Sequence, residues 1–183
     1  MNNRGHAVTT MMITATSILG NVYRDPLLKE KYHKIPGESV KISRMESQRV
    51  RMRKSSNKGT DIAITLPPGS RLHHGDVVLD TDDKMVIVEL EPENVAVVQV
   101  RTDSLHKDDL IEVAVKIGHT IGNLHRPIKL EEDKIYFPIQ AESELDMFHK
   151  LFGHVNEHVE IKSAKMVFEP EDEMTAVEHV HEH

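Results

Sequence analysis

The stretch from Val95 to His119 reads VAVVQVRTDSLHKDDLIEVAVKIGH, and it contains two different hydrophobic periods. Its first six residues, 95–100, are mostly β-branched, which is typical of a buried strand. From Leu105 to about His119, apolar residues instead recur at the helical spacing i, i+3, i+4, i+7. These residues are Leu110, Val113, Ala114 and Ile117. The stretch therefore predicts a strand followed by an amphipathic helix.

The residues after this helix continue the alternation of strand and helix. Two strands are predicted at Pro127–Leu130 and Lys134–Pro138, joined by an acidic turn. A second helix is predicted from Ser143 to Gly153, where glycine supplies the C-cap, and a last strand runs from His158 towards Phe168. The order strand-helix-strand-strand-helix-strand is that of the ferredoxin-like split motif. One ferredoxin-like domain is therefore expected over residues 94–168.

The first half of the chain shows strand patterns and turn signals instead. Residues Asp61–Leu66 alternate apolar and polar side chains, and Pro67-Pro68-Gly69 is a turn signal. Similar short apolar runs follow, separated by further turns. An all-β domain, a small sandwich or barrel, is therefore expected over residues 12–91. The predicted fold class of the whole chain is α+β.

Charge differs between the two parts of the chain. Residues 1–54 carry 11 Lys and Arg against 4 Asp and Glu, whereas the remainder carries 12 against 26. Such asymmetry indicates domains with different partners. The polar residues 1–11 are expected to be disordered, and residues 169–183 to form a flexible acidic tail. Three arginines alternate on one strand face, which indicates a solvated face or, alternatively, a docking surface for an acidic protein; they are Arg49, Arg51 and Arg53.

Composition excludes several classes of protein. The chain has no cysteine, so disulfides and thiolate metal sites are excluded. No apolar run reaches the roughly 18 residues of a membrane helix, and no clear signal peptide is present, so a soluble cytoplasmic protein without a membrane partner is expected. Nucleic-acid binding is disfavoured, because the net charge is -7 and aromatic residues make up only 4%.

No catalytic set is recognisable in the sequence. There is no phosphate-binding loop of the type that hydrolyses GTP, and no His-Glu-x-x-His pair. A metal-dependent hydrolase would therefore lack a positioned base. We do not expect the chain to be an enzyme.

The chain holds 13 histidines, and three of them alternate at its end: His179, His181 and His183. On an extended segment such residues point to the same side, and imidazole is a good ligand for zinc, copper and nickel. The tail is therefore interpreted as a metal-binding segment. A solvated polar tail or a cloning remnant are the alternatives.

A second candidate histidine lies where the first predicted helix ends, in Gly118-His-Thr-Ile-Gly-Asn-Leu-His-Arg-Pro-Ile128. Gly122 and Asn123 tolerate left-handed backbone angles and are expected to stop the helix. His125 would then be held at a rigid corner. On spacing alone, a histidine at a helix end more often caps carbonyl groups or faces water than binds a metal.

Three segments together resemble the urease accessory protein E family of nickel metallochaperones. Residues 121–128, Ile-Gly-Asn-Leu-His-Arg-Pro-Ile, resemble its Leu-Gly-Asn-Arg-His motif. Residues 66–77, Leu-Pro-Pro-Gly-Ser-Arg-Leu-His-His-Gly-Asp-Val, resemble its Leu-Pro-Arg-Gly…Leu-x-x-Gly-Asp-Val segment. Residues 168–171, Phe-Glu-Pro-Glu, resemble the Phe-x-Pro-Glu that precedes its histidine-rich tail.

The resemblance implies an all-β partner-binding domain followed by a ferredoxin-like domain that forms a homodimer and binds Ni2+. His125 matches the motif histidine, which lies at the two-fold axis in that family, and His179, His181 and His183 would complete the coordination. Zn2+ or Cu2+ could occupy the same ligands in vitro. The implied partners are the urease apoprotein and the urease accessory proteins, including the accessory GTPase.

The sequence departs from the family pattern at Leu124, where Arg is common, and at Thr120, where some members carry a further histidine. His119 stands one residue earlier, and no metal role is transferred to it. The alternative function is a protein-binding adaptor built on the β domain, in which metal binding is incidental.

Overall fold

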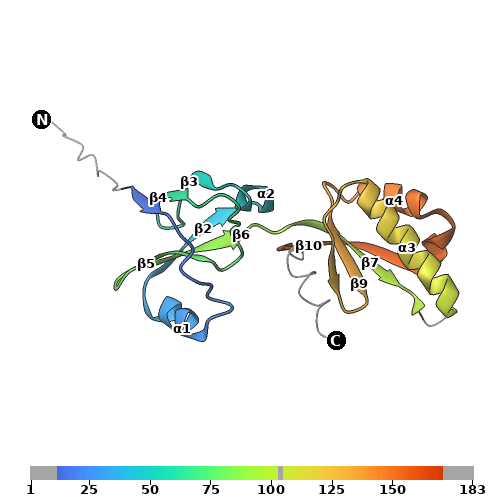
Figure 1. Cartoon of the computed structure of the whole chain (residues 1–183), viewed down its shortest axis with the longest axis horizontal. Helices are drawn as coiled ribbons and strands as arrows, with labels where there is room; N and C mark the ends of the chain where they lie inside the picture. Colours follow the sequence, from blue (N-terminus) through green and yellow to red (C-terminus); the bar gives the residue numbers. More distant parts are fainter. Residues whose placement is uncertain (1–11, 103–104, 171–183) are drawn as a thin grey trace, which may run out of the picture. The chain divides into compact units, whose positions relative to one another are not determined.

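The computed structural model describes residues 12–102 and 105–170. The chain divides into two compact units, residues 1–91 and 92–183 (Figure 1). The N-terminal unit contains two sheets and the C-terminal unit one, and each unit has its own core. No helix within the described residues is long and apolar enough to cross a membrane.

The N-terminal unit contains two three-stranded sheets. In the first, β4 (Asp61–Thr65) is the central strand, parallel to β1 (Ile13–Ala15) and antiparallel to β3 (Arg51–Ser55). The alternation predicted for this stretch is observed, because Ile62 and Ile64 are fully buried.

The second sheet has the order β2-β6-β5. Its central strand β6 (Met85–Leu90) pairs in parallel with β2 (Gly37–Ile42) and antiparallel with β5 (Val77–Asp80). The β6 burial pattern is almost continuous, as expected of a strand covered on both faces.

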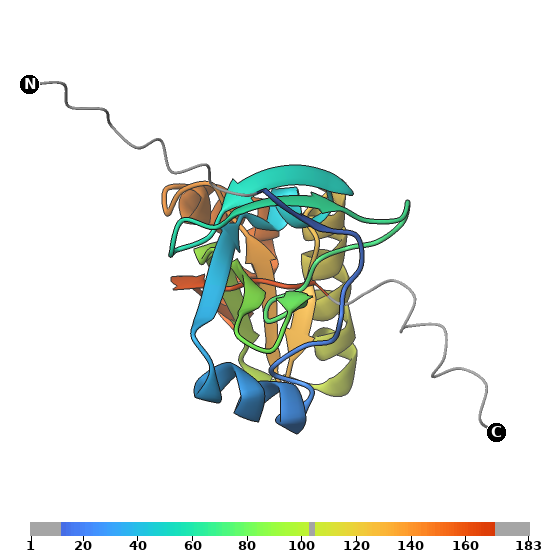
Figure 2. The same ribbon diagram turned by 90° about the vertical axis from the view of Figure 1, so that its left-hand side faces the viewer.

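The expectation of an all-β N-terminal domain is wrong, because this unit also contains two helices. Helix α1 (Pro26–Lys34) leads into β2, as Figure 2 shows. Asp25 caps it, accepting the N–H of Leu27 at 2.8 Å and that of Leu28 at 3.4 Å. No residue of α1 is fully buried, and the two half-buried side chains that pack against the core, Leu28 and Tyr32, make only a short apolar pattern.

Helix α2 (Arg44–Ser47) is a single turn built on a capping box. The Ser43 hydroxyl accepts the N–H of Glu46 at 3.2 Å, and the Glu46 carboxylate accepts the N–H of Ser43 at 3.1 Å. Local capping rather than hydrophobic periodicity therefore defines both helices of this unit.

A buried carboxylate stabilises the N-terminal unit. Glu38 on β2 is 4% exposed, and it accepts the Ser56 hydroxyl at 2.5 Å and the Lys84 ammonium at 3.1 Å. Burial alone would raise the pKa of the Glu38 carboxyl, but hydrogen bonds from Ser56, Thr60 and Lys84 outweigh it and hold the pKa below its usual value.

The C-terminal unit shows the predicted order of strands and helices. In chain order its elements are β7 (Glu93–Val100), α3 (Lys107–Asn123), β8 (Lys129–Glu131), β9 (Lys134–Pro138), α4 (Glu144–Phe152) and β10 (Val159–Met166). A 3-10 helix, Gly153–His158, joins α4 to β10. The sheet is antiparallel throughout, with the order β10-β7-β9-β8.

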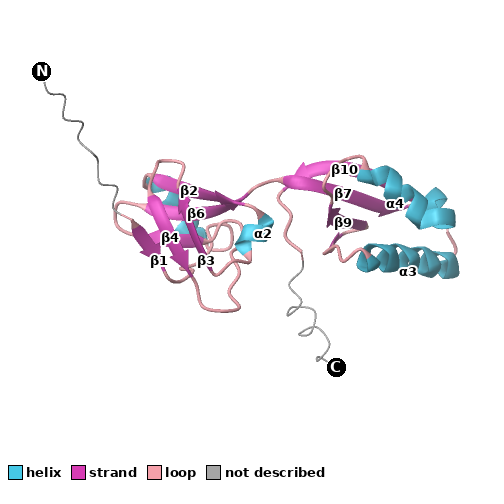
Figure 3. Cartoon of the chain, turned by 90° about the horizontal axis from the view of Figure 1, so that it is seen from above, coloured by secondary structure: helices cyan, strands magenta, loops and turns pink. Residues whose placement is uncertain are grey.

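Helices α3 and α4 cover one face of this sheet (Figure 3). The buried face of α3 carries Val113, Ile117 and Ile121, which pack in the same core as the sheet residues. Aromatic rings fill the space under α4, where the centroids of Phe137 and Phe148 lie 4.6 Å apart. Burial of these residues fixes the rotation of α3 and therefore which of its side chains face outwards.

Candidate metal centre

His125 occupies the left-handed position of a Schellman motif that ends α3. Its φ angle is 52°, and its N–H donates to the carbonyl of Gly122 at 2.9 Å. The N–H of Arg126 donates to the carbonyl of Ile121 at 3.4 Å, which completes the motif. Glycine is usual at this position, but histidine is among the residues that adopt left-handed angles more often than most.

The predicted end of the helix at Gly122 and Asn123 is observed, because α3 ends at Asn123, but neither residue makes the left-handed turn. Both residues lie inside α3, and neither has a positive φ. The helix continues to Asn123 because Ile121 is fully buried in the core and holds the last turn against the sheet. The histidine itself therefore makes the turn.

Arg126, the residue after His125, anchors the corner to two other elements. Its Nη1 donates to the carbonyl of Pro138 at the end of β9, at 3.1 Å, and its Nη2 binds Oε2 of Glu144 at 2.7 Å. The other carboxylate oxygen of Glu144 accepts the N–H of Gln140 at 2.6 Å. The backbone on the C-terminal side of His125 is thus tied to β9 and to the first turn of α4.

The His125 side chain is exposed, and no described residue hydrogen-bonds its ring. Its neighbours along the chain include two exposed apolar residues, Leu124 at 38% and Ile128 at 40%. An exposed imidazole with both nitrogens open to solvent can bind a metal or a second molecule without first losing an internal partner.

A row of uncharged residues on the outer side of α3 leads to His125, and we call it the α3 stripe. It consists of Ile111, Val115, Gly118 and Gly122, all exposed and three or four residues apart. Ile111 is 54% exposed and Val115 65%. A Cβ atom added to Gly118 or Gly122 would meet nothing within 4 Å. The stripe is therefore an apolar surface that permits close approach of another backbone.

His119 does not join His125. Its Nε2 lies 2.9 Å from the amide nitrogen of Asn123, one turn further along α3. Because that amide nitrogen can only donate, it occupies the lone pair of Nε2. Thr120, the next residue along α3, is buried at 8% exposure.

Other histidines have separate partners in the structure. His74 Nδ1 accepts the N–H of Leu90 at 3.1 Å, and His149 Nδ1 lies 2.6 Å from Oδ1 of Asn156. Within residues 12–102 and 105–170, no three His, Asp or Glu side chains gather as a metal site would require. His179, His181 and His183 lie outside the described residues.

Comparison with known proteins matches both units. Residues 15–91 match the family model of the UreE urease accessory protein N-terminal domain, and residues 93–183 match that of the C-terminal domain. The urease accessory protein UreE of Yersinia bercovieri is 31% identical over 158 residues, which are 84% of this chain and 69% of the relative.

Two further relatives show the same level of identity over a shorter stretch. The UreE proteins of Yersinia pestis (strain Pestoides F) and Yersinia pseudotuberculosis (serotype O:1b, strain IP 31758) are each 31% identical over 131 residues, 70% of this chain. The matched stretch spans 57% of each of these relatives, which is less than two thirds of their length.

Proposed function

Because this chain belongs to the urease accessory protein E family, we propose that it is a nickel metallochaperone that works as a homodimer in the assembly of the urease active site. As a member of a family of accessory proteins, it is not an enzyme. The observation that carries the proposal is the exposed, left-handed His125 at the end of the uncharged α3 stripe.

The two units take different roles in this proposal. The C-terminal unit, with its strand order β10-β7-β9-β8, is assigned as a ferredoxin-like domain for metal binding and dimerisation. The N-terminal unit is assigned as the partner-binding domain. The partners proposed for it are the urease apoprotein and the other urease accessory proteins, including the accessory GTPase.

The α3 stripe supports a homodimer. Val115 is 65% exposed, and a contiguous apolar surface on a helix is unfavourable in water unless it is covered. Gly118 and Gly122 permit another helix to approach closely. A symmetric dimer uses the same surface on both copies, so a two-fold axis near the end of the stripe brings two His125 side chains together.

Nickel is the proposed cargo of this shared site. One chain does not gather three ligating side chains within the part that the structure describes, so the further ligands are proposed to come from the second copy and from residues 171–183. Two imidazoles leave most coordination positions of Ni2+ open, and His179, His181 and His183 are proposed to occupy them. Zn2+ and Cu2+ suit the same imidazole ligands.

Ligands that exchange readily suit delivery better than storage. The tail histidines can be replaced one at a time by ligands of a receiving protein, so that the ion is never released into solution. We place this exchange in the cytoplasm, since a chain without cysteine fits a reducing compartment.

Native mass spectrometry of the nickel-loaded chain tests the proposal. The expected species is a dimer with one tightly held ion, and removal of residues 179–183 should lower the fraction of dimers that carry the ion but keep the dimer. A chain that stays monomeric with nickel bound would contradict the shared site. It would favour the second candidate, a protein-binding adaptor in which metal binding is incidental.

A further inference from the structure

Strand β3 lies at the edge of its sheet and, among the described residues, pairs with β4 alone. A backbone hydrogen bond of 2.7 Å joins Val50 and Leu66 at one end of this ladder, and one of 2.8 Å joins Ser56 and Thr60 at the other. Bonded residues alternate along an antiparallel ladder, so the backbone groups of the odd-numbered residues face away from β4. These residues are Arg51, Arg53 and Ser55.

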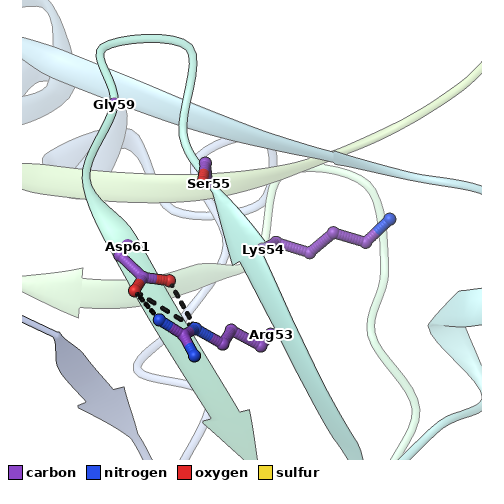
Figure 4. A pocket seen from close by; sticks show the side chains of 5 residues that line it. All are labelled: Arg53, Lys54, Ser55, Gly59 and Asp61. Carbon is purple, nitrogen blue, oxygen red and sulfur yellow. Dashed lines mark hydrogen bonds and ion pairs between the residues drawn. The ribbon is translucent and has the colours of Figure 1, made fainter.

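The same three residues also have exposed side chains, whereas those of Met52 and Lys54 are half-buried on the other face. Arg53 is held in a defined orientation. Its Nε lies 3.0 Å from Oδ1 of Asp61 and its Nη2 lies 2.5 Å from Oδ2, which leaves the third guanidinium nitrogen without a bond (Figure 4). The edge thus presents unpaired backbone groups beside an oriented guanidinium.

A shallow hollow of about 360 Å3 adjoins this edge. It is lined by Arg53, Lys54, Ser55, Gly59 and Asp61 (Figure 4). Two further cations nearby, Arg51 on the strand and Lys58 in the β3–β4 turn, are exposed and form no ion pair with a described residue. A ligand that lies along β3 therefore meets hydrogen-bonding backbone, positive charge and room for a side chain.

We propose that β3 is a docking edge for an extended acidic segment of a partner protein, which adds to the sheet as a fourth strand. Backbone hydrogen bonds would supply affinity, and side chains at alternate positions would supply specificity. Arg51 and Arg53 lie on one face two residues apart, about 7 Å along a strand. A segment with carboxylates on every second residue matches that spacing. The inference deepens the partner-binding role proposed for this unit and does not require nickel at His125.

Cations on an edge strand also prevent two copies from pairing edge to edge. Preventing such pairing requires a net positive charge along the strand, but two of the cations on and beside β3 are balanced by carboxylates. Asp61 binds Arg53, and Glu46 binds Lys54 at 2.7 Å. The guanidinium of Arg53, which Asp61 holds in place, still has one nitrogen available, and this favours recognition of a carboxylate over simple repulsion.

The test uses the full chain and a fluorescein-labelled, capped peptide of nine residues in which glutamate and valine alternate. Binding is measured by fluorescence anisotropy. The double variant Arg51→Glu/Arg53→Glu should weaken binding at least about tenfold, because it reverses the charge that faces the peptide. The control Arg24→Glu/Lys29→Glu makes the same change of charge at two exposed residues away from β3 and should change binding less than about twofold.

Two N-methylated peptides test strand addition with the unaltered protein. Methylation of alternate amides on the side that faces β3 should abolish binding, whereas methylation of the other alternate amides should leave it unchanged. Equal binding of both peptides, or no binding at about 1 mM peptide, overturns the proposal. So does a charge-reversed variant that binds as well as its control. Nickel titration of the same variants separates this result from a failure of the His125 site.

Discussion

The guanidinium of Arg126 binds the carboxylate of Glu144 at 2.7 Å, and Arg126 directly follows the left-handed His125 in the chain. Both side chains are about one-fifth exposed, at 23% and 18%. The pair therefore joins the end of α3 to the start of α4 in a partly desolvated place. His125 lies between this anchor and the last turn of the helix.

Removal of the anchor should weaken both the fold and the metal site. Arg126→Ala is expected to lower the free energy of unfolding by about 1–3 kcal/mol, because it leaves Glu144 and the Pro138 carbonyl without their partner. Urea denaturation measures this loss, and calorimetry should show weaker nickel binding. Lys129→Ala, which breaks an exposed pair with Glu131, serves as the control and should cost less than about 1 kcal/mol. Equal losses in the two variants would show that Arg126 is not an anchor.

At residue 125 the left-handed backbone favours glycine for stability, whereas the proposed metal site requires histidine. His125→Gly should be more stable than His125→Ala by about 1 kcal/mol, because glycine adopts a φ of 52° without steric cost and alanine does not. Neither variant retains the imidazole. Thermal denaturation of the metal-free proteins makes the comparison. An alanine variant as stable as the glycine variant would mean that the turn relaxes when the side chain is changed.

Charge placed in the α3 stripe should break the dimer. Val115→Lys puts an ammonium group into the proposed interface, whereas Met147→Lys puts one on α4, at a methionine that is 37% exposed. Burial of an unpaired ammonium costs several kcal/mol, which is enough to separate the subunits. Light scattering should give a monomer for Val115→Lys and a dimer for Met147→Lys. A dimeric Val115→Lys chain would place the interface elsewhere.

The buried Glu38 carboxylate should make the N-terminal unit sensitive to acid. The pKa of Glu38 lies below its ordinary value of 4.5 in the folded chain, so the contribution of the carboxylate to stability is complete above pH 4.5 and is lost as the pH falls through the folded pKa. Glu38→Gln should lower the free energy of unfolding by about 1–3 kcal/mol at pH 7. It should also make that free energy fall less steeply as the pH drops below 4.5.

Glu160→Gln is the matched control for that experiment. The pKa of Glu160 is also lowered, by its hydrogen bond to Lys162, but the carboxylate lies in an exposed pair on β10. Solvent screens such a pair, so this variant should keep nearly the acid profile of the parent. If both variants behave alike, the burial of Glu38 does not decide the acid sensitivity.

The sequence predicts the C-terminal unit well because its elements carry clear periods. The predicted helix from Ser143 to Gly153 is observed as α4, and the predicted strand Lys134–Pro138 is observed as β9 with the same bounds. In both cases, apolar spacing reflects burial against a single core. Helix α1 was missed for the converse reason, since none of its residues is fully buried.

The candidate site was only partly predictable. The motif around His125 points to the residue, but not to its left-handed angle, because the end of α3 depends on how Ile121 packs against the sheet. The outward direction of the α3 stripe likewise follows from the burial of the opposite face of the helix. The anchoring role of Arg126 could not be predicted from the sequence, because its two partners are 12 and 18 residues away in the chain.

The central claim is that His125 from two chains holds one nickel ion, and calorimetric titration of the metal-free dimer tests it most directly. The account predicts one tight site per two chains in the parent and in His119→Ala, and the loss of that site in His125→Ala. Tight binding that persists unchanged in His125→Ala would contradict the account and place the nickel on other histidines.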